Sequence, residues 1–154
     1  MKILMVCLGN ICRSPLAEGI LQTITMEKQL DWSIDSAGTS SWHVGKQPDS
    51  RSIKVAQKYG IDITQQRARQ LQVADFQAFD IIYAMDSSNY NDIRRLAPTE
   101  ADKAKVRLIL NEVSAGQNRA VPDPYWGDDG FQSVYQMLEE ACQAIVQKSL
   151  EKRL

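Results

Sequence analysis

Residues 6–15 constrain the fold more than any other stretch, because they join a short apolar run to a helical pattern through a tight loop. The apolar residues 3–6 predict a buried strand. The dipeptide Gly9-Asn10, inside the loop, readily adopts the positive φ that a sharp turn requires. Ser14-Pro15 is typical of a helix N-cap followed by the first helical position. We therefore predict a strand, a loop and a helix whose N-terminus closes the loop.

The predicted loop has the features of an anion-binding site. Backbone N–H groups that curl around a point ahead of a helix bring unpaired donors and the positive end of the helix dipole together. A thiolate at Cys7 would be stabilised by these groups and by the guanidinium of Arg13. The spacing suits a phosphate, with the sulfur below phosphorus and the arginine binding two oxygens. The intervening N–H groups would surround it: Leu8, Gly9, Asn10, Ile11 and Cys12.

A simpler interpretation treats Cys7 as a buried structural cysteine and Arg13 as an exposed side chain on an ordinary strand-to-helix turn. The spacing alone does not decide between the two. The strand before the loop, the Gly9-Asn10 turn and the Ser14-Pro15 pair after the arginine together favour a nucleophilic cysteine.

A second candidate lies in residues 111–129, which show no convincing helix or strand. A loop of this length in a small domain is usually functional. Within it, Asp123 stands between Pro122 and Pro124, which restrict the backbone and would hold a carboxylate stiffly. A turn aspartate is the simpler interpretation, and only the presence of Cys7 makes Asp123 a candidate general acid.

Composition sets broad limits. The 154 residues are 44% hydrophobic with a formal net charge of −1, which indicates one domain without a basic surface for nucleic acid or anionic lipid. The apolar run at the start is too short for a signal peptide or a membrane span. Three cysteines, Cys7, Cys12 and Cys142, cannot all pair and match no zinc pattern. We expect a cytoplasmic protein.

His43 is the one histidine, so it limits the possible chemistry. A Cys–His pair, a histidine metal cluster and a Ser-His-Asp triad would each have to use it. Its surroundings have the composition of a loop, which favours a surface residue. A general acid is therefore expected to be a carboxylate, and we predict neither a metal site nor a cofactor.

The rest of the chain alternates between strand and helix patterns. Strands are predicted at residues 32–36, 80–85 and 106–110, and helices at 15–28, 50–59, 73–79, 87–96 and from 131 onward. This order predicts a single α/β domain with a four-stranded parallel sheet flanked by helices on both faces, flavodoxin-like or Rossmann-like. Cys7, Asp86 and Asp123 would meet at the C-terminal edge of the sheet. Cys142 falls on the core face of the last helix.

Several segments together resemble the low-molecular-weight protein tyrosine phosphatases, in their bacterial form. Residues 6–18, VCLGNICRSPLAE, resemble the phosphate-binding loop of this family, and residues 122–125, PDPY, resemble its acid loop. The similarity continues in order along nearly the whole chain, through residues 35–39, Trp42, residues 68–70 and residues 83–86.

The resemblance implies roles for individual residues. Cys7 would attack phosphorus, Arg13 and the loop amides would hold the phosphoryl oxygens, and Asp123 would protonate the leaving phenolate. Ser14 would donate to the sulfur, and Asn10 would be the left-handed loop residue supported by Ser36. Three loop aromatic residues would wall the cleft or, in the simpler interpretation, pack as ordinary loop side chains: Trp42, Tyr125 and Trp126.

Three positions bear on specificity and regulation. Gln66 stands where many relatives have a histidine that supports the loop asparagine. Cys12 has the family's position for a redox-resolving cysteine, unless it only packs beneath the loop. Ile11 occupies the position where the resembling arginine phosphatases carry threonine, which favours phosphotyrosine here.

Other functions on the same fold stay open. They are a protein arginine phosphatase, a thiol-dependent arsenate reductase, which would need further relay cysteines, and a phosphotyrosine-binding pseudoenzyme, which would usually have lost Cys7, Arg13 or Asp123. The resemblance implies phosphotyrosine-containing proteins as partners, with a tyrosine kinase and its substrates as candidates, and we expect a monomer that contacts neither nucleic acid nor membrane.

Overall fold

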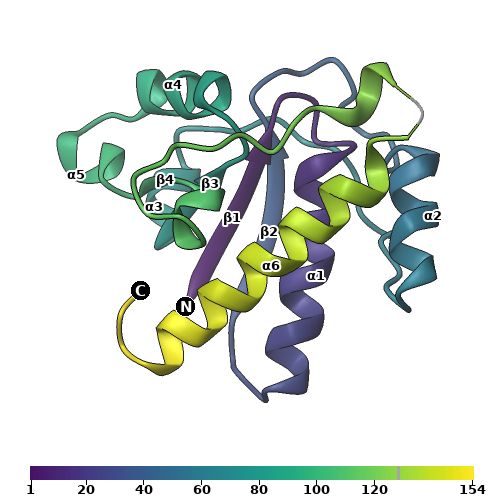
Figure 1. Ribbon diagram of the computed structural model, residues 1–154. Helices are drawn as coiled ribbons and strands as arrows, with labels where there is room; N and C mark the ends of the chain where they lie inside the picture. Colours follow the sequence, from purple (N-terminus) through teal and green to yellow (C-terminus); the bar gives the residue numbers. More distant parts are fainter. Residues whose placement is uncertain (128) are drawn as a thin grey trace.

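Strand β1 (Lys2–Cys7) lies inside a four-stranded sheet whose order is β2-β1-β3-β4 (Figure 1). The other strands are β2 (Ser33–Gly38), β3 (Ile81–Ala84) and β4 (Val106–Leu108), and all neighbours are parallel. The computed structural model describes residues 1–127 and 129–154. It confirms the predicted four-stranded parallel sheet.

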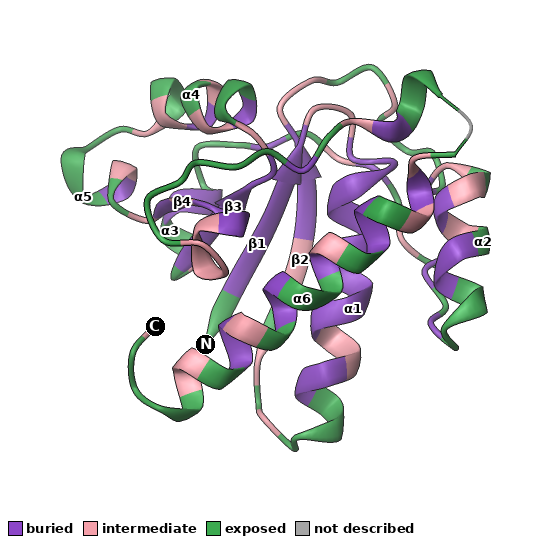
Figure 2. Cartoon of the chain, in the orientation of Figure 1, coloured by how far each residue is buried: buried purple, intermediate pink, exposed green. Residues whose placement is uncertain are grey.

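Helices cover both faces of the sheet because the side chains of β1 alternate between two apolar clusters. Ile3 and Met5 pack with α1 (Arg13–Glu27), α2 (Ser50–Lys58) and α6 (Phe131–Leu150). Leu4 and Val6 face the second cluster, to which α3 (Asp75–Ala78) and α4 (Ser87–Leu96) contribute. Figure 2 shows β1 buried along almost its whole length. The predicted two-sided cover is confirmed.

The register places the strand ends at one level. Cys7 pairs with Gly38, and its neighbour Val6 pairs with both Ala37 and Ala84. Ala84 in turn pairs with Leu108 on β4. The loops that leave these strands therefore start from the same edge, where ligand clefts of parallel sheets form.

The predicted N-cap of the first helix is wrong. Helix α1 starts at Arg13 with Cys12 as its N-cap residue, and no side chain caps it. Ser14 lies inside the first turn, and Pro15 is tolerated there because the first N–H groups of a helix have no partner within it. Asp49 and Asp86 cap α2 and α4, since their carboxylates accept from Arg51 N and Asn89 N.

Shorter elements differ more from the predictions. Strand β4 ends at Leu108 and continues as the 3-10 turn η1 (Ile109–Glu112), and a short helix α5 (Glu100–Lys103), capped by Thr99, was not predicted. The predicted loop 111–129 contains a second 3-10 turn, η2 (Pro124–Trp126), and its residue 128 lies outside the described residues. Within the described ranges, no helix is long and apolar enough to span a membrane.

Candidate active site

The loop between β1 and α1 turns sharply at Asn10, which has a φ of 56°. The buried Asn10 side chain fixes this conformation through three hydrogen bonds. Its Nδ2 donates to Ser14 Oγ at 2.8 Å and to Ser36 Oγ at 3.0 Å, while its Oδ1 accepts from Arg69 N at 3.0 Å. The loop is therefore held against α1, β2 and the segment before α3 at once.

The Ser14 side chain caps no helix because its hydroxyl is used in two other contacts. Its Oγ lies 3.1 Å from Cys7 Sγ and already accepts the hydrogen bond from Asn10. The hydroxyl proton is therefore available to the sulfur, so Ser14 can donate to a Cys7 thiolate. Only about 2% of Cys7 is exposed, at the floor of a cavity.

Arg13 is held rigidly beside the sulfur. Its Nη1 donates to Asp86 Oδ2 at 2.7 Å and to the Val121 carbonyl at 2.9 Å. Burial alone would lower the pKa of Arg13, but the neighbouring Cys7 sulfur and the Asp86 carboxylate raise it above its usual value. The guanidinium thus stays charged, with its plane set by Asp86.

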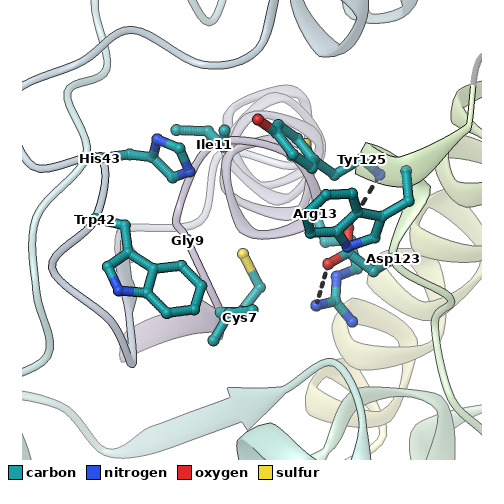
Figure 3. Close-up of a pocket in the computed structure, with 11 residues that line it drawn as sticks. Cys7, Gly9, Ile11, Arg13, Trp42, His43, Asp123 and Tyr125 are labelled. Carbon is teal, nitrogen blue, oxygen red and sulfur yellow. Dashed lines mark hydrogen bonds and ion pairs between the residues drawn. The ribbon is translucent and has the colours of Figure 1, made fainter.

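Asp123 lies across the cavity from Cys7 (Figure 3). Its Oδ1 accepts from Tyr125 N at 3.1 Å, and its Oδ2 lies 3.7 Å from Arg13 Nη2, which is longer than a hydrogen bond. The backbone before it is anchored just beyond the end of β3, because Val121 N donates to Met85 O at 2.8 Å. The carboxylate is partly exposed and can reach a group bound in the cavity.

The cavity of about 220 Å³ brings together most of the predicted site residues (Figure 3). Asn10, Ser14 and Ser36 do not line it and instead support the loop. Trp42 and Trp126 are 70% and 82% exposed, so they stand at its rim and are not packed as core residues. The lining residues are Cys7, Leu8, Gly9, Ile11, Cys12, Arg13, Trp42, His43, Asp123, Tyr125 and Trp126.

His43 lines the cavity, although its sequence context predicted an ordinary surface position. Its ring lies 6.1 Å from the ring of Tyr125 and passes so close to Gly9 that a Cβ there would lie 2.9 Å from His43 Cδ2. The missing side chain of Gly9 therefore allows the His43 ring to approach the loop backbone. Gly9 was the only sequence signal for this contact.

Sequence reasoning also missed Glu18, on the buried face of α1. Its Oε1 accepts from Ser36 Oγ at 2.7 Å, and burial raises its pKa to about 7, with the Ser36 hydrogen bond opposing the shift. Gln66 was expected near Asn10, but its Nε2 donates to the Pro15 carbonyl. A carboxyl group on an otherwise apolar helix face was the available signal for Glu18.

The three cysteines are unpaired and buried. Burial raises the pKa of Cys12, with further contributions from Asp49 and Cys7. Cys142 packs in the core with its Sγ 3.8 Å from the Ala17 carbonyl, as predicted. Over residues 1–127 and 129–154, no group of three His, Cys, Asp or Glu side chains could hold a metal ion.

Comparison with known proteins agrees with this geometry. The family model for low molecular weight phosphotyrosine protein phosphatase matches residues 2–154. A curated relative, low molecular weight phosphotyrosine protein phosphatase 1 from Drosophila melanogaster, is 41% identical over 155 residues, which covers 98% of each chain.

Solved structures show the same fold. A protein tyrosine phosphatase from Entamoeba histolytica, with Hepes in its active site, is 39% identical with a TM-score of 0.93, covering 100% of this chain and 99% of that chain. A Drosophila arginine phosphatase is 35% identical with a TM-score of 0.90, covering 97% and 98%. With a family match over nearly its whole length, the chain belongs to the low molecular weight phosphotyrosine protein phosphatase family.

Proposed function

We propose that this chain is a protein tyrosine phosphatase that hydrolyses phosphotyrosine and aryl phosphates through a cysteinyl-phosphate intermediate, with residues 1–154 acting as one domain. The observation that carries the proposal is the arrangement of Cys7, Arg13 and Asp123 around one cavity, with Ser14 Oγ 3.1 Å from the sulfur. Family membership supports the same reaction.

In the first step, the Cys7 thiolate attacks phosphorus in line with the phenolic oxygen. An S–P bond forms as the O–P bond breaks, and Asp123 gives its proton to the departing oxygen. Asp86 and the Val121 carbonyl hold Nη1 of Arg13, so the Nε–Nη2 edge binds the equatorial oxygens together with the loop amides.

In the second step, the ionised Asp123 takes a proton from water, which attacks phosphorus and breaks the S–P bond. The products are inorganic phosphate and the Cys7 thiolate. The Ser14 hydroxyl stabilises the departing sulfur by donating to it. The electron pair of each broken bond stays on the leaving atom, so neither step requires a redox cofactor.

The aromatic rim supports an aryl substrate. The rings of Tyr125 and Trp126 meet edge to face with centroids 4.9 Å apart, and Trp42 lies on the opposite side of the opening (Figure 3). Ile11, which lines the same cavity, adds an apolar branched surface. A flat phenyl ring would be held between these side chains.

We propose that Ile11 sets the preference between two substrates, phosphotyrosine and phosphoarginine. Phosphoarginine would be the substrate if the chain were instead an arginine phosphatase. We expect the parent to prefer phosphotyrosine, and Ile11→Thr to lose roughly 10-fold in kcat/KM for phosphotyrosine, because it loses apolar contact with the ring. The same change should raise kcat/KM for phosphoarginine. Steady-state kinetics of the parent and of Ile11→Thr, each with phosphotyrosine and with phosphoarginine, test the proposed function.

Ile11→Val is the matched control, because it keeps a branched apolar side chain, and it should keep the preference of the parent. A parent that already prefers phosphoarginine would contradict the substrate assignment. A parent that hydrolyses neither phosphoester nor phosphoarginine would contradict the phosphatase proposal as a whole.

The arsenate reductase alternative is less well supported. A thiol-dependent reductase needs cysteines that relay electrons from the active site to a reductant. The only cysteine outside the loop, Cys142, is completely buried between α6 and α1, and burial raises its pKa. Cys142 is therefore poorly placed to exchange disulfides.

We also propose that Cys12 protects Cys7 from irreversible oxidation. Both thiols line the same cavity. Mild peroxide should yield a Cys7–Cys12 disulfide that dithiothreitol reverses, whereas in Cys12→Ser the Cys7 sulfenic acid should be oxidised further and activity should not return. The measurement is activity after peroxide and then thiol, with mass spectrometry of the peptides. Equal rescue of parent and variant would contradict the role.

Phosphotyrosine-containing proteins, among them a tyrosine kinase and its substrates, are the partners that this function implies. A cytoplasmic location is part of the same proposal, supported by three unpaired cysteines. We propose a monomer as the active form, because one chain supplies the nucleophile, the arginine and the candidate acid around a single cavity.

A further inference from the structure

Arg51 lies in the first turn of α2, two residues after the capping residue Asp49, and its guanidinium is held in a defined orientation. Asp49 Oδ1 accepts from Arg51 Nε at 3.0 Å and Asp49 Oδ2 accepts from Arg51 Nη2 at 3.0 Å. This paired contact is partly buried, with 11% of the Asp49 side chain exposed. It fixes the plane of the guanidinium.

The remaining donors of this guanidinium reach the loop that carries Asp123. Arg51 Nη1 donates to the Gly127 carbonyl at 2.7 Å, and Nη2 also donates to the Tyr125 carbonyl at 3.1 Å. The guanidinium carbon lies 4.6 Å from the ring centre of Phe131, where α6 begins. Figure 1 shows α2 beside this part of the chain.

The start of α2 is also attached to the phosphate-binding loop. Asp49 N donates to the Ile11 carbonyl at 2.8 Å, and Ser52 Oγ donates to the Cys12 carbonyl at 3.2 Å. The first turn of α2 therefore contacts the backbone of both loops that line the cavity. Of these contacts, Arg51 makes those with the acid loop.

One hydrogen bond links these Arg51 contacts to the Asp123 carboxylate. Asp123 Oδ1 accepts its hydrogen bond from Tyr125 N, so the placement of the residue 125 backbone sets the orientation of the carboxylate. Resting on the proposed function, we propose that Arg51 is a positioning residue for the general acid, which holds the acid loop over Cys7 through the Tyr125 and Gly127 carbonyls. Arg51 is not among the residues that line the cavity, so we assign it a role through the loop.

The test uses Arg51→Lys, which keeps the charge and the apolar stem but loses the planar fork. A single ammonium group cannot replace all these contacts in their present geometry. We expect kcat/KM to fall about 10-fold to 100-fold with phosphotyrosine, whose leaving group needs the proton. With a dinitrophenyl phosphate, whose phenolate leaves unaided, we expect a change of less than about threefold.

The same substitution made in the Asp123→Ala variant separates positioning of the acid from a general structural role. In Asp123→Ala the acid is gone, so adding Arg51→Lys should change phosphotyrosine kcat/KM by less than about twofold. Arg95→Lys on α4, where the side chain is 75% exposed, is the matched control and should leave both esters unchanged. The affinity of Arg51→Lys for inorganic phosphate should equal that of the parent.

Asp49→Asn provides an independent variant in case Arg51→Lys folds poorly. Its amide oxygen can still cap α2, but the charged pair with Arg51 is lost, so it should show the same dependence on the leaving group. Equal losses with both esters, or an undiminished loss in the Asp123→Ala background, would overturn this inference while the phosphatase function stands. A parent that does not turn over aryl phosphates would overturn both.

Discussion

Cys7→Ser should abolish turnover of aryl phosphates, with a loss on the order of 10⁵-fold or more in kcat, because a serine hydroxyl is not ionised at neutral pH. Binding of inorganic phosphate should survive within a few-fold, since the loop N–H groups and the Arg13 guanidinium remain. Initial rates and calorimetric titration with phosphate measure the two properties separately. This separation of binding from turnover is the expected signature of a nucleophile.

Cys142→Ser is the control for the loss of a thiol elsewhere. Its sulfur is buried in the core, so the variant should lose roughly 1–3 kcal/mol of unfolding free energy but keep its kcat below the unfolding temperature. The thiolate mechanism would be contradicted by a parent that loses activity in a chelator and regains it with a divalent metal.

The sheet could be predicted because its strands are short, apolar and separated by helical patterns. Residues 3–6 form the middle of β1 in the structure, and the predicted strand before Asp86 is β3. Boundaries at β4 were less predictable, since the apolar residues Ile109 and Leu110 continue the strand pattern but fold into a 3-10 turn. Burial explains their hydrophobicity in either conformation.

The error at Ser14 has a chemical cause. A serine next to proline ordinarily caps a helix, but here the hydroxyl lies between Asn10 Nδ2 and Cys7 Sγ. The N–H groups that a cap would satisfy are the donors that an anion would use. Local propensity thus gave the wrong helix start at the position where the proposed function needs unpaired N–H groups.

Supporting residues were harder to predict than lining residues, because they act through contacts between distant segments. Glu18 meets Ser36, His43 approaches Gly9, and Arg51 reaches a loop more than seventy residues away. Neither spacing nor composition fixes such pairs. The loop residues 7–13 were predictable because their spacing along the chain already brings the thiol, the backbone N–H groups and the arginine to one point, although distant segments then hold the loop in place.

Asp123→Ala should lose about 10²–10⁴-fold in kcat/KM with phosphotyrosine, the usual span for general acid catalysis, and much less with a nitrophenyl ester. The physical reason is that a basic phenolate needs a proton in the transition state, whereas a weakly basic one leaves without it. A series of aryl phosphates should therefore give a steeper dependence of log kcat/KM on leaving-group pKa for the variant than for the parent.

Asp123→Asn is the sharper companion, because an amide oxygen can still accept from Tyr125 N and keep the turn but no proton can be donated. It should follow Asp123→Ala in its leaving-group dependence, while Asp92→Ala on α4 should follow the parent. The other nearby carboxylates are already occupied, since Asp86 accepts from Arg13 and Asn89 and Asp49 accepts three times from Arg51. An equal loss with every ester, together with recovery in Asp123→Asn, would make Asp123 a structural residue of the loop, and the proton donor would then have to be sought first at Asp86 or Asp49.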